Sequence, residues 1–243
     1  MGQLDGKVAI VTGSSRSIGK AIAIGLAKEG ARLVVAARTP ETLNATAEKI
    51  RESDSEALVV PTDVRVEEQI ESLFEKTMEH YGRLDILVNN AGIFASSPFD
   101  ELSTETWDDV IATNLRGAFL CSRAAFRIMK AQGGGRIINI GSVSASRVRP
   151  GNAPYSSAKF GMVGLTQTIA LEGRDYNINC GILHPGVVIR DDMPEHIKKN
   201  KNIASMSSEE IAAAAVFMAC QPPHVNVLEL VQLPKDQPYL GRG

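Results

Sequence analysis

Short runs of β-branched and other apolar residues alternate along the chain with longer segments whose apolar positions recur every three to four residues. Short apolar runs are typical of strands covered on both faces, and the three-to-four spacing is typical of amphipathic helices. The pattern predicts strands at Val8–Val11, Leu33–Ala36, Ala57–Val60, Ile86–Val88, Arg136–Ile140, Ile178–Leu183 and Leu228–Leu233. It predicts helices at Ile18–Glu29, Pro40–Glu52, Val66–Tyr81, Ser103–Met129, Tyr155–Glu172 and from the Ser207/Glu210 capping box to Ala219.

Strands that alternate with helices form a parallel sheet with helices on both faces. We therefore predict an α/β fold, a single doubly wound Rossmann domain with about seven parallel strands. No linker divides residues 1–243, so one dinucleotide-binding domain with a built-in active site is expected. Two long loops, Ser142–Pro154 and 184–207, follow strands at the edge where such sheets bind ligands. Loop 184–207 is expected to cover the substrate. The tail, residues 234–243, is expected to pack against a neighbouring subunit or to lie loose.

Composition narrows the class of protein further. The 243 residues carry a formal net charge of -2, so nothing favours a nucleic-acid partner or an anionic membrane surface. Three cysteines, Cys121, Cys180 and Cys220, are too few and too far apart to predict a disulfide framework or a metal site, and we interpret them as small core residues. There is no apolar secretion signal at the start and no apolar stretch near the ~20 residues of a membrane helix. A cytoplasmic enzyme without a metal is expected.

The first predicted strand runs into a glycine loop, Thr12 to Gly19, and a helix follows. Backbone N–H groups and the positive end of the helix dipole meet at such a turn, which makes it a site for phosphate. The spacing of Gly13 and Gly19, with Ala21 in place of a Ser or Thr, excludes a Walker loop. Taken alone, the loop is as compatible with a structural turn as with a bound cofactor.

Tyr155 and Lys159 lie four residues apart in a predicted helix and therefore share one face. A free phenol titrates near ~10, and a neighbouring ammonium favours the phenolate. The pair is suited to proton transfer with an alcohol or carbonyl oxygen, although an isolated Tyr-x-x-x-Lys is more often a pair of surface residues. Ser142 follows an apolar strand, where its hydroxyl can polarise a substrate oxygen, and Ser144 or Ser146 fits the same loop.

Taken together, these motifs resemble the short-chain dehydrogenase/reductase family. The matching elements are Thr12-Gly13 to Gly19, Asp63, Asn89-Asn90-Ala91-Gly92, Asn114, Ser142, Tyr155, Lys159 and Pro185-Gly186. The resemblance implies reversible hydride transfer between a nicotinamide and a carbonyl or secondary alcohol, with Tyr155 carrying the proton and Ser142 positioning the oxygen. It implies that Lys159 lowers the pKa of the phenol and binds the nicotinamide ribose, and that Asn114 holds a water connected to Lys159. It also implies a small-molecule substrate and a homotetramer or homodimer.

The expected cofactor contacts extend from the glycine loop to the turn after the sixth strand. They are Gly13, Ser15, Arg16, Ser17, Ile18, Gly19, Arg38, Asp63, Val64, Asn90, Ala91, Gly92, Tyr155, Lys159, Pro185, Gly186 and Val188. The second strand ends in Ala36-Ala37-Arg38-Thr39, which offers no carboxylate to a ribose 2′-hydroxyl. Arg38, with Arg16 as a second candidate, can bind a 2′-phosphate instead, so NADP is predicted as the cofactor over NAD.

Three features depart from the family pattern. Ser17 stands in place of the middle glycine, and Arg190 stands where a Thr usually bonds the nicotinamide carboxamide. Arg190 is interpreted either as a site for a substrate carboxylate or phosphate, or as a solvent-facing side chain. The ending from Gln221 to Leu230 resembles that of 3-hydroxy-acid dehydrogenases of the family, which hints at the substrate. Substrate contacts are predicted at Phe94, Ser144, Arg147, Asn152 and Arg190.

Two other functions stay open. A 3-oxoacyl-carrier-protein reductase needs a basic surface beside its cleft, and the arginines and lysine available for it are Arg123, Arg127, Lys130, Arg147 and Arg149. A non-catalytic NADP-binding sensor is expected to lack Tyr155, Lys159 or Ser142, all of which are present. The segment around Ser142 is not a Gly-x-Ser-x-Gly elbow, which disfavours a serine hydrolase.

Overall fold

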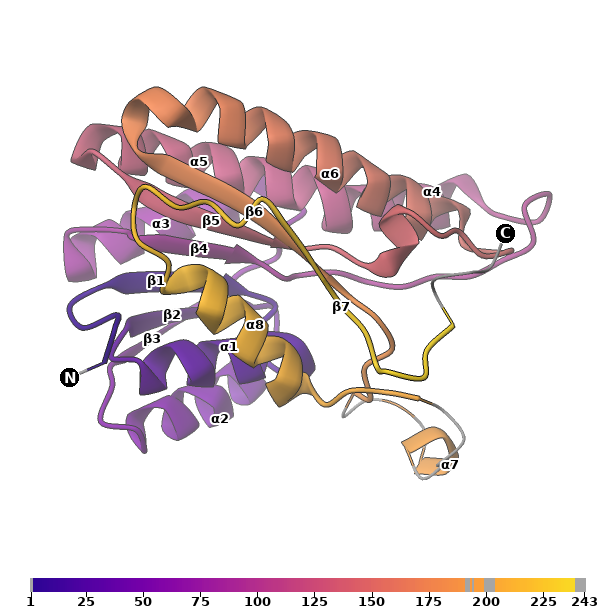
Figure 1. Ribbon diagram of the computed structural model, residues 1–243, viewed down its shortest axis with the longest axis horizontal. Helices are drawn as coiled ribbons and strands as arrows, with labels where there is room; N and C mark the ends of the chain where they lie inside the picture. Colours follow the sequence, from indigo (N-terminus) through magenta and orange to yellow (C-terminus); the bar gives the residue numbers. More distant parts are fainter. Residues whose placement is uncertain (1, 191–192, 194, 199–203, 239–243) are drawn as a thin grey trace.

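The computed structural model describes residues 2–190, 193, 195–198 and 204–238, and its centre is one parallel sheet with strand order β3-β2-β1-β4-β5-β6-β7 (Figure 1). The strands are β1 (Val8–Thr12), β2 (Arg32–Ala37), β3 (Ala57–Pro61), β4 (Ile86–Asn89), β5 (Gly135–Ile140), β6 (Ile178–Pro185) and β7 (Glu229–Gln232). The helices are α1 (Ser17–Lys28), α2 (Pro40–Arg51), α3 (Glu67–Tyr81), α4 (Thr104–Ile111), α5 (Gly117–Gln132), α6 (Ala153–Gly173), α7 (Glu195–Lys198) and α8 (Ser208–Ala219). The predicted doubly wound fold with seven parallel strands is confirmed.

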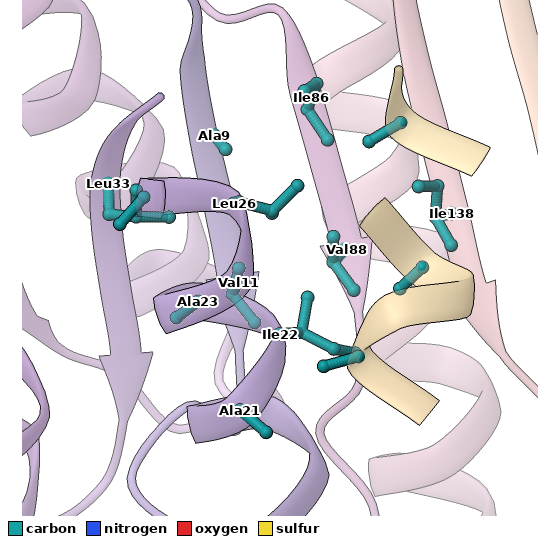
Figure 2. Packing of buried hydrophobic residues seen from close by; sticks show 14 of the residues in the cluster. Ala9, Val11, Ala21, Ile22, Ala23, Leu26, Leu33, Ile86, Val88 and Ile138 are labelled. Carbon is teal, nitrogen blue, oxygen red and sulfur yellow. The ribbon is translucent and has the colours of Figure 1, made fainter. Parts of the chain in front are cut away.

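Helices cover both faces of the sheet, with α1, α2 and α8 on one side and α3, α5 and α6 on the other (Figure 1). Successive strand residues point to opposite faces, so Ala9 and Val11 belong to one core cluster and Val8 and Ile10 to the other. Figure 2 shows the first cluster, where Ile22 and other α1 side chains lie against the central strands. Burial on both faces explains why the strands have continuous apolar runs instead of alternating ones.

The strand order indicates where along the sheet a ligand is expected to bind. The chain leaves β3 at one edge and returns to β4 beside β1, so connections on either side of the β1–β4 pair run in opposite directions across the sheet. Ligands in open parallel sheets bind outside the carboxyl ends of the strands at such a reversal. The glycine loop after β1, the segment after β4 and the two long loops after β5 and β6 all start at this edge.

The helical region predicted at Ser103–Met129 consists of two helices joined by a π-helical turn at Ala112–Arg116. Asn114 lies in this turn and is buried. Its Oδ1 accepts a hydrogen bond from the backbone N–H of Ile93 and its Nδ2 donates to the carbonyl of Ile93, both at 2.8 Å. A π turn inserts an extra residue into a helix, and such insertions are frequent at functional sites.

The first part of the C-terminal tail folds back on its own chain. The side-chain Oε1 of Gln237 accepts a hydrogen bond of 2.7 Å from the backbone N–H of Val187, just after β6. Gly186 lies against Leu233 and Pro234, and a Cβ at this position would be 3.0 Å from each of them. Residues 234–238 therefore pack beside the root of the 184–207 loop and are not loose, and a contact of the tail with a neighbouring subunit stays a prediction. Residues 239–243 lie outside the described residues.

The three cysteines match their interpretation as core residues. Cys121 and Cys180 are buried, Cys220 is partly buried, and all three are free thiols. Burial raises the pKa of Cys121 to about 12 and also raises the pKa values of the other two. Within the described part of the chain there is no cluster of three or more His, Cys, Asp or Glu side chains suited to a metal ion. No helix in that part is long and apolar enough to cross a membrane.

Candidate active site

The carboxyl end of β5 and the start of α6 bring three of the predicted catalytic side chains together. The Ser142 hydroxyl lies near enough to the Tyr155 phenol to lower the pKa of the phenol through hydrogen bonding. Lys159, one helical turn further along α6, places its Nζ 5.6 Å from the centroid of the Tyr155 ring. Phe94, from the segment after β4, packs edge-on against Tyr155 with 5.3 Å between ring centroids. The cluster therefore collects side chains from three separate segments at the carboxyl edge of the sheet.

Local hydrogen bonds hold Ser142 in place. Its backbone is extended and caps a short 3₁₀ turn, Val143–Ala145. Its Oγ accepts a bond of 3.1 Å from the N–H of Ser144, and its carbonyl accepts one of 2.9 Å from Ala145. The two other serines considered for the role of Ser142 differ from it in exposure, since Ser144 is buried and Ser146 is exposed. Of these three serines, Ser142 is the one whose hydroxyl bonds the phenol.

The pKa of Tyr155 departs from our expectation. We expected the Lys159 ammonium to lower it, but burial dominates and the pKa of the phenol is raised. The opposing effects come from the hydrogen bond of Ser142 and from the positive charge of Arg190. Lys159 instead donates a hydrogen bond of 2.6 Å from Nζ to the carbonyl of Ile140 at the end of β5. The sequence spacing placed the ammonium on the correct helix face but did not show which acceptor it binds.

Lys159 is enclosed by protein. Burial disfavours its charged form and lowers the pKa of the side chain to about 8. The sulfur of Met162, 3.7 Å from Nζ, lies on the next turn of the same helix. At neutral pH the side chain therefore stays an ammonium, held between a backbone carbonyl and the face of the Tyr155 ring.

Asn114 is anchored to the segment that carries Phe94. Both polar atoms of its side chain bond the backbone of Ile93, the residue before Phe94. Gly92 passes close by, since a Cβ there would be 3.4 Å from the Asn114 side-chain oxygen. The Asn114 side chain thus fixes one wall of the site, and the water-holding role that the resemblance implies for Asn114 stays a prediction.

The glycine loop is bonded to the neighbouring strands. Gly13 N–H donates to the carbonyl of Ala36 at 2.7 Å, and Ser14 Oγ accepts from the N–H of Ala36 at 2.9 Å. Asn90 Nδ2 donates to the carbonyls of Thr12 and Gly13 at 2.9 and 3.1 Å. Gly13 has a positive φ of 66°, and a Cβ there would lie only 2.8 Å from Ala91 Cα. The loop therefore requires glycine at this position for both space and conformation.

A cavity of about 450 Å³ opens beside the N-terminus of α1. It is lined by Ser17, Lys20, Ala21, Ile24, Ile189 and residues 205–209. The first turn of α1 contains no acidic residue to oppose the positive end of the helix dipole, and the carboxylate among the lining residues is that of Glu209. Lys20 adds a cation to this cavity. The sequence reasoning missed Lys20, which lies one turn inside the helix and belongs to no motif.

Ser17 adopts a left-handed backbone conformation with φ of 46°. A left-handed backbone costs an L-residue roughly 1–2 kcal/mol, and glycine avoids this cost. Glycine also loses more conformational freedom on folding, which reduces the gain by about 0.5–1 kcal/mol. We expect Ser17→Gly to stabilise the protein by ~0.5–1 kcal/mol, a rise in Tm of ~1–4 °C in thermal unfolding. Ser15→Gly is the matched control, because Ser15 has no positive φ. It should lower Tm, and an equal effect of both changes would contradict the strain argument.

The turn after β3 holds an ion pair between Asp63 and Arg65 that could not be predicted from the sequence. The Asp63 carboxylate binds the Arg65 guanidinium through both oxygens, with Nη2–Oδ2 at 2.8 Å and Nε–Oδ1 at 3.1 Å. Arg65 also contacts Asp109 at 3.1 Å. These bonds, together with the charge of Arg38, hold the pKa of Asp63 below its usual value. Arg38 is exposed just after β2, and the cofactor contact predicted for Asp63 stays a prediction.

The segment after β6 presents its backbone in a defined way. The carbonyl of Val187 accepts from the N–H of Met206, and the N–H of Ile189 donates to the carbonyl of Met206, both at 2.9 Å. Because successive backbone groups alternate in direction, the N–H and C=O of Val188 face away from Met206. Arg190 follows two residues later, is half-buried, and acts electrostatically on Tyr155. The structure thus brings Arg190 to the same site as the phenol.

The other predicted substrate residues differ in placement. Asn152 is buried just before α6, and Arg147 is exposed on the loop after Ser142. Gly151 in the same loop accepts a backbone hydrogen bond of 3.0 Å from Ser97, which joins this loop to the segment after β4. The two loops therefore form one wall around Tyr155.

The basic surface suggested for a carrier protein does not form as one patch. Arg123 pairs with Glu67 and also lies 5.4 Å from the centroid of the Phe119 ring. Lys130 lies 4.0 Å from the centroid of the Tyr176 ring, near the end of α5 that is remote from Asn114. At 1.5 Å per residue, Lys130 is roughly 24 Å along the helix from that residue. Only Arg147 and Arg149 of the suggested set lie on the loop beside the site.

Comparison with known proteins agrees with this geometry. Residues 7–202 match the family model of short chain dehydrogenases. The chain is 36% identical over 229 residues to a 3-oxoacyl-[acyl-carrier-protein] reductase of Synechocystis sp., covering 91% of this chain and 92% of that protein. It is 36% identical over 230 residues to glucose 1-dehydrogenase 2 of Bacillus subtilis, covering 90% and 89%. A solved structure of an actinorhodin polyketide ketoreductase variant with NADPH superposes with a TM-score of 0.87 at 32% identity, covering 96% and 98%. The chain therefore belongs to the short-chain dehydrogenase/reductase family of NAD(P)-dependent oxidoreductases that act on CH–OH and C=O groups.

Proposed function

We propose that this chain is an NADP(H)-linked oxidoreductase that interconverts a carbonyl compound and a secondary alcohol, with a small 3-oxo or 3-hydroxy acid as substrate. The observation that carries this proposal is the grouping of the Ser142 hydroxyl and the Tyr155 phenol, one helical turn from the buried ammonium of Lys159. A phenol and a hydroxyl placed beside each other can hold one substrate oxygen between them.

The residues present fit a phosphorylated dinucleotide. The N-terminus of α1 has no carboxylate in its first turn, and the cavity beside it contains Lys20. Arg38 stands at the end of β2, where a carboxylate would repel a 2′-phosphate, and a guanidinium binds phosphate through paired N–H groups. Backbone N–H and C=O groups of Val188 supply a donor and an acceptor for a carboxamide. When bound, the nicotinamide supplies the hydride to the substrate carbon or takes it up in the reverse direction.

The side chains of this chain account for the proton. In reduction, the Tyr155 hydroxyl donates its proton to the carbonyl oxygen as that oxygen becomes an alkoxide, so the product is a neutral alcohol and a phenolate. Ser142 donates a hydrogen bond to the same oxygen and stabilises the developing charge. The Lys159 ammonium, 5.6 Å from the phenol ring centroid, favours the phenolate that remains. Oxidation of the alcohol follows the same steps in reverse.

Arg190 supports the choice of an acidic substrate. Its charge acts on the phenol of Tyr155, so it lies within electrostatic range of the position where the substrate oxygen binds. A guanidinium beside the site offers a partner for a substrate carboxylate, and a charge-assisted hydrogen bond of this kind contributes about 1.5–3 kcal/mol. The ending that resembles 3-hydroxy-acid dehydrogenases agrees with this choice.

A second candidate is reduction of a 3-oxoacyl group on a carrier protein. Arg147 and Arg149 are exposed on the loop beside Ser142 and offer positive charge to an acidic partner. The Synechocystis relative with that activity is 36% identical to this chain. The non-catalytic sensor is not favoured, because Ser142, Tyr155 and Lys159 are present and lie together.

A panel of substrates distinguishes these functions. NADPH oxidation would be measured with 3-oxobutanoate, its N-acetylcysteamine thioester, the carrier-protein thioester, simple ketones and quinones, and NADP⁺ reduction with 3-hydroxybutanoate. We expect kcat/KM for 3-oxobutanoate to exceed that for 2-butanone by at least about 10-fold, because one charge-assisted hydrogen bond is lost with the ketone. A preference for the carrier-protein thioester would establish the second candidate, and NADPH binding without turnover of any class would favour the sensor.

We further propose that the protein forms a homotetramer or homodimer. Large apolar side chains are exposed on the outer helices, with Phe119 43%, Phe160 49% and Leu171 57% accessible. Large apolar side chains that are exposed on helices are compatible with subunit contacts. Light scattering coupled to size-exclusion chromatography gives the mass directly. Cytoplasmic localisation stays a prediction.

A further inference from the structure

His184 lies directly behind Ser142, and no step of the proposed reaction uses it. It is the penultimate residue of β6, it is 3% exposed, and its ring contacts the segment that follows the neighbouring strand β5. A Cβ at Gly141 would be 2.6 Å from His184 Nδ1, so the glycine leaves room for the ring. The sequence reasoning treated this residue only as the start of a loop.

One ring nitrogen of His184 contacts the backbone of Ser142. Nδ1 is 2.8 Å from the Ser142 carbonyl oxygen, and the backbone N–H of Ser142 is directed at the same nitrogen with an N···N distance of 3.2 Å. A protonated Nδ1 donates to the carbonyl and cannot accept from the N–H, so the two contacts belong to different tautomers, and we assign the proton of the neutral ring to Nδ1 because the contact with the carbonyl is the shorter one. Ser142 therefore receives a hydrogen bond at its backbone while its side chain bonds Tyr155.

The second ring nitrogen faces a carboxylate across a gap. Nε2 is buried and has no hydrogen-bond partner among the described residues, but Glu229 Oε1 at the start of β7 lies 3.4 Å away. With the proton on Nδ1, the lone pair of Nε2 faces this carboxylate. A second proton on the ring would convert the contact to a charge-assisted hydrogen bond, whose normal length is about 2.8 Å.

The charged groups around His184 act in opposite directions. Burial lowers its pKa below the ordinary 6.5, and the nearby Lys159 charge from α6 lowers it too. The Glu229 carboxylate and the Ser142 carbonyl raise it. The ring is therefore neutral near pH 7 and becomes an imidazolium as the pH falls through its lowered pKa.

We propose that His184 is a positioning residue for Ser142, and that Glu229 controls its protonation. The neutral ring holds the Ser142 carbonyl through Nδ1–H. The imidazolium binds Glu229 as well, which draws the ring toward β7 and displaces the Ser142 hydroxyl from the phenol of Tyr155. The inference rests on the proposed function for its effect on turnover, but the tautomer and the influence of Glu229 are properties of the folded chain alone.

Nitrogen NMR of the imidazoles tests the structural part without any substrate. The chain has four histidines, and the His184 signals are identified by their loss in His184→Asn. We expect an Nδ1–H tautomer at pH 7.5 and a pKa below 6.5 that falls further in Glu229→Gln. Glu172→Gln removes an exposed carboxylate near the far end of α6 and should leave the His184 titration unchanged. An Nε2–H tautomer, or a titration that Glu229→Gln does not move, would overturn the proposal.

Kinetics test the positioning role. His184→Asn keeps a hydrogen-bonding atom near the place of Nδ1, whereas His184→Leu retains bulk but has no polar atom. We expect kcat to fall about 5-fold in His184→Leu and less than about 3-fold in His184→Asn, with the Kd for NADPH within about 2-fold in both, since one backbone hydrogen bond contributes ~1 kcal/mol. The decline of kcat on the acid side of the wild-type pH profile that comes from His184 should be absent in His184→Asn.

A comparison of His184→Asn with His184→Gln remains decisive even if His184→Leu does not fold. Gln extends its amide toward the place of Nε2 and away from Ser142, so its kcat should be below that of Asn. Equal kcat for Asn and Gln, or a wild-type acid limb retained in His184→Asn, would contradict the positioning role. If the NMR results hold while no substrate is turned over, the proposed function fails and the His184–Glu229 coupling stands.

Discussion

Tyr155→Phe is expected to lower kcat by about 10²–10⁴-fold while the Kd for NADPH changes by less than about 2-fold. The change removes only the hydroxyl that donates the proton, and it keeps the ring that Phe94 packs against. Stopped-flow measurement of NADPH oxidation, together with fluorescence titration of NADPH binding, separates turnover from cofactor affinity. The matched control is Tyr176→Phe, which removes a phenol hydroxyl beside Phe126 and Lys130, away from the site.

The control should keep kcat within about 2-fold of the parent. Turnover of Tyr155→Phe within about 10-fold of the parent would contradict the assignment of Tyr155 as the proton donor. A parallel loss of NADPH affinity would instead indicate that the phenol serves mainly to hold the cofactor.

Arg38→Asp should reverse the cofactor preference. The ratio of kcat/KM for NADPH to that for NADH is expected to fall by at least about 100-fold, because a charge-assisted bond to the 2′-phosphate of about 1.5–3 kcal/mol is replaced by repulsion. The Asp at this position also gives the ribose 2′-hydroxyl of NADH an acceptor. Steady-state kinetics with both cofactors at a fixed substrate concentration measure the ratio directly.

Arg127→Asp makes the same charge change at an exposed position of α5 and should leave the ratio unchanged. A parent enzyme with equal kcat/KM for both cofactors would contradict the NADP(H) proposal. So would an Arg38→Asp variant that keeps the parent ratio, in which case Arg16 or Lys20 would be the next residues to test.

Most of the fold could be predicted from the sequence because the continuous apolar runs of the strands and the three-to-four-residue spacing of the helices are both clear. Fully buried strands such as β1 require continuous apolar runs, and the helices that cover them require one apolar face. The π turn at Ala112–Arg116 could not be predicted, because it depends on the bond between the Asn114 side chain and a segment more than twenty residues earlier. The return of the tail onto Val187 likewise depends on a contact between distant residues.

The candidate site was predictable where spacing along one element determines position. Tyr155 and Lys159 share a helix face, and Ser142 follows a strand that ends at the same edge of the sheet. The pKa shifts of the site residues were not predictable, since they depend on burial and on neighbours from other elements. That is why the raised pKa of Tyr155 and the position of His184 became visible only in the folded chain.

The most direct test of the central claim follows the hydride and its proton. The protein would be incubated with NADPH that carries deuterium at both C4 positions and with the most reactive carbonyl compound of the panel, and the product would be examined by mass spectrometry and NMR. The account predicts one deuterium on the former carbonyl carbon, transferred by the parent and by Tyr176→Phe but at most about 1% as fast by Tyr155→Phe. A product without deuterium at that carbon, or equal transfer by Tyr155→Phe, would contradict it.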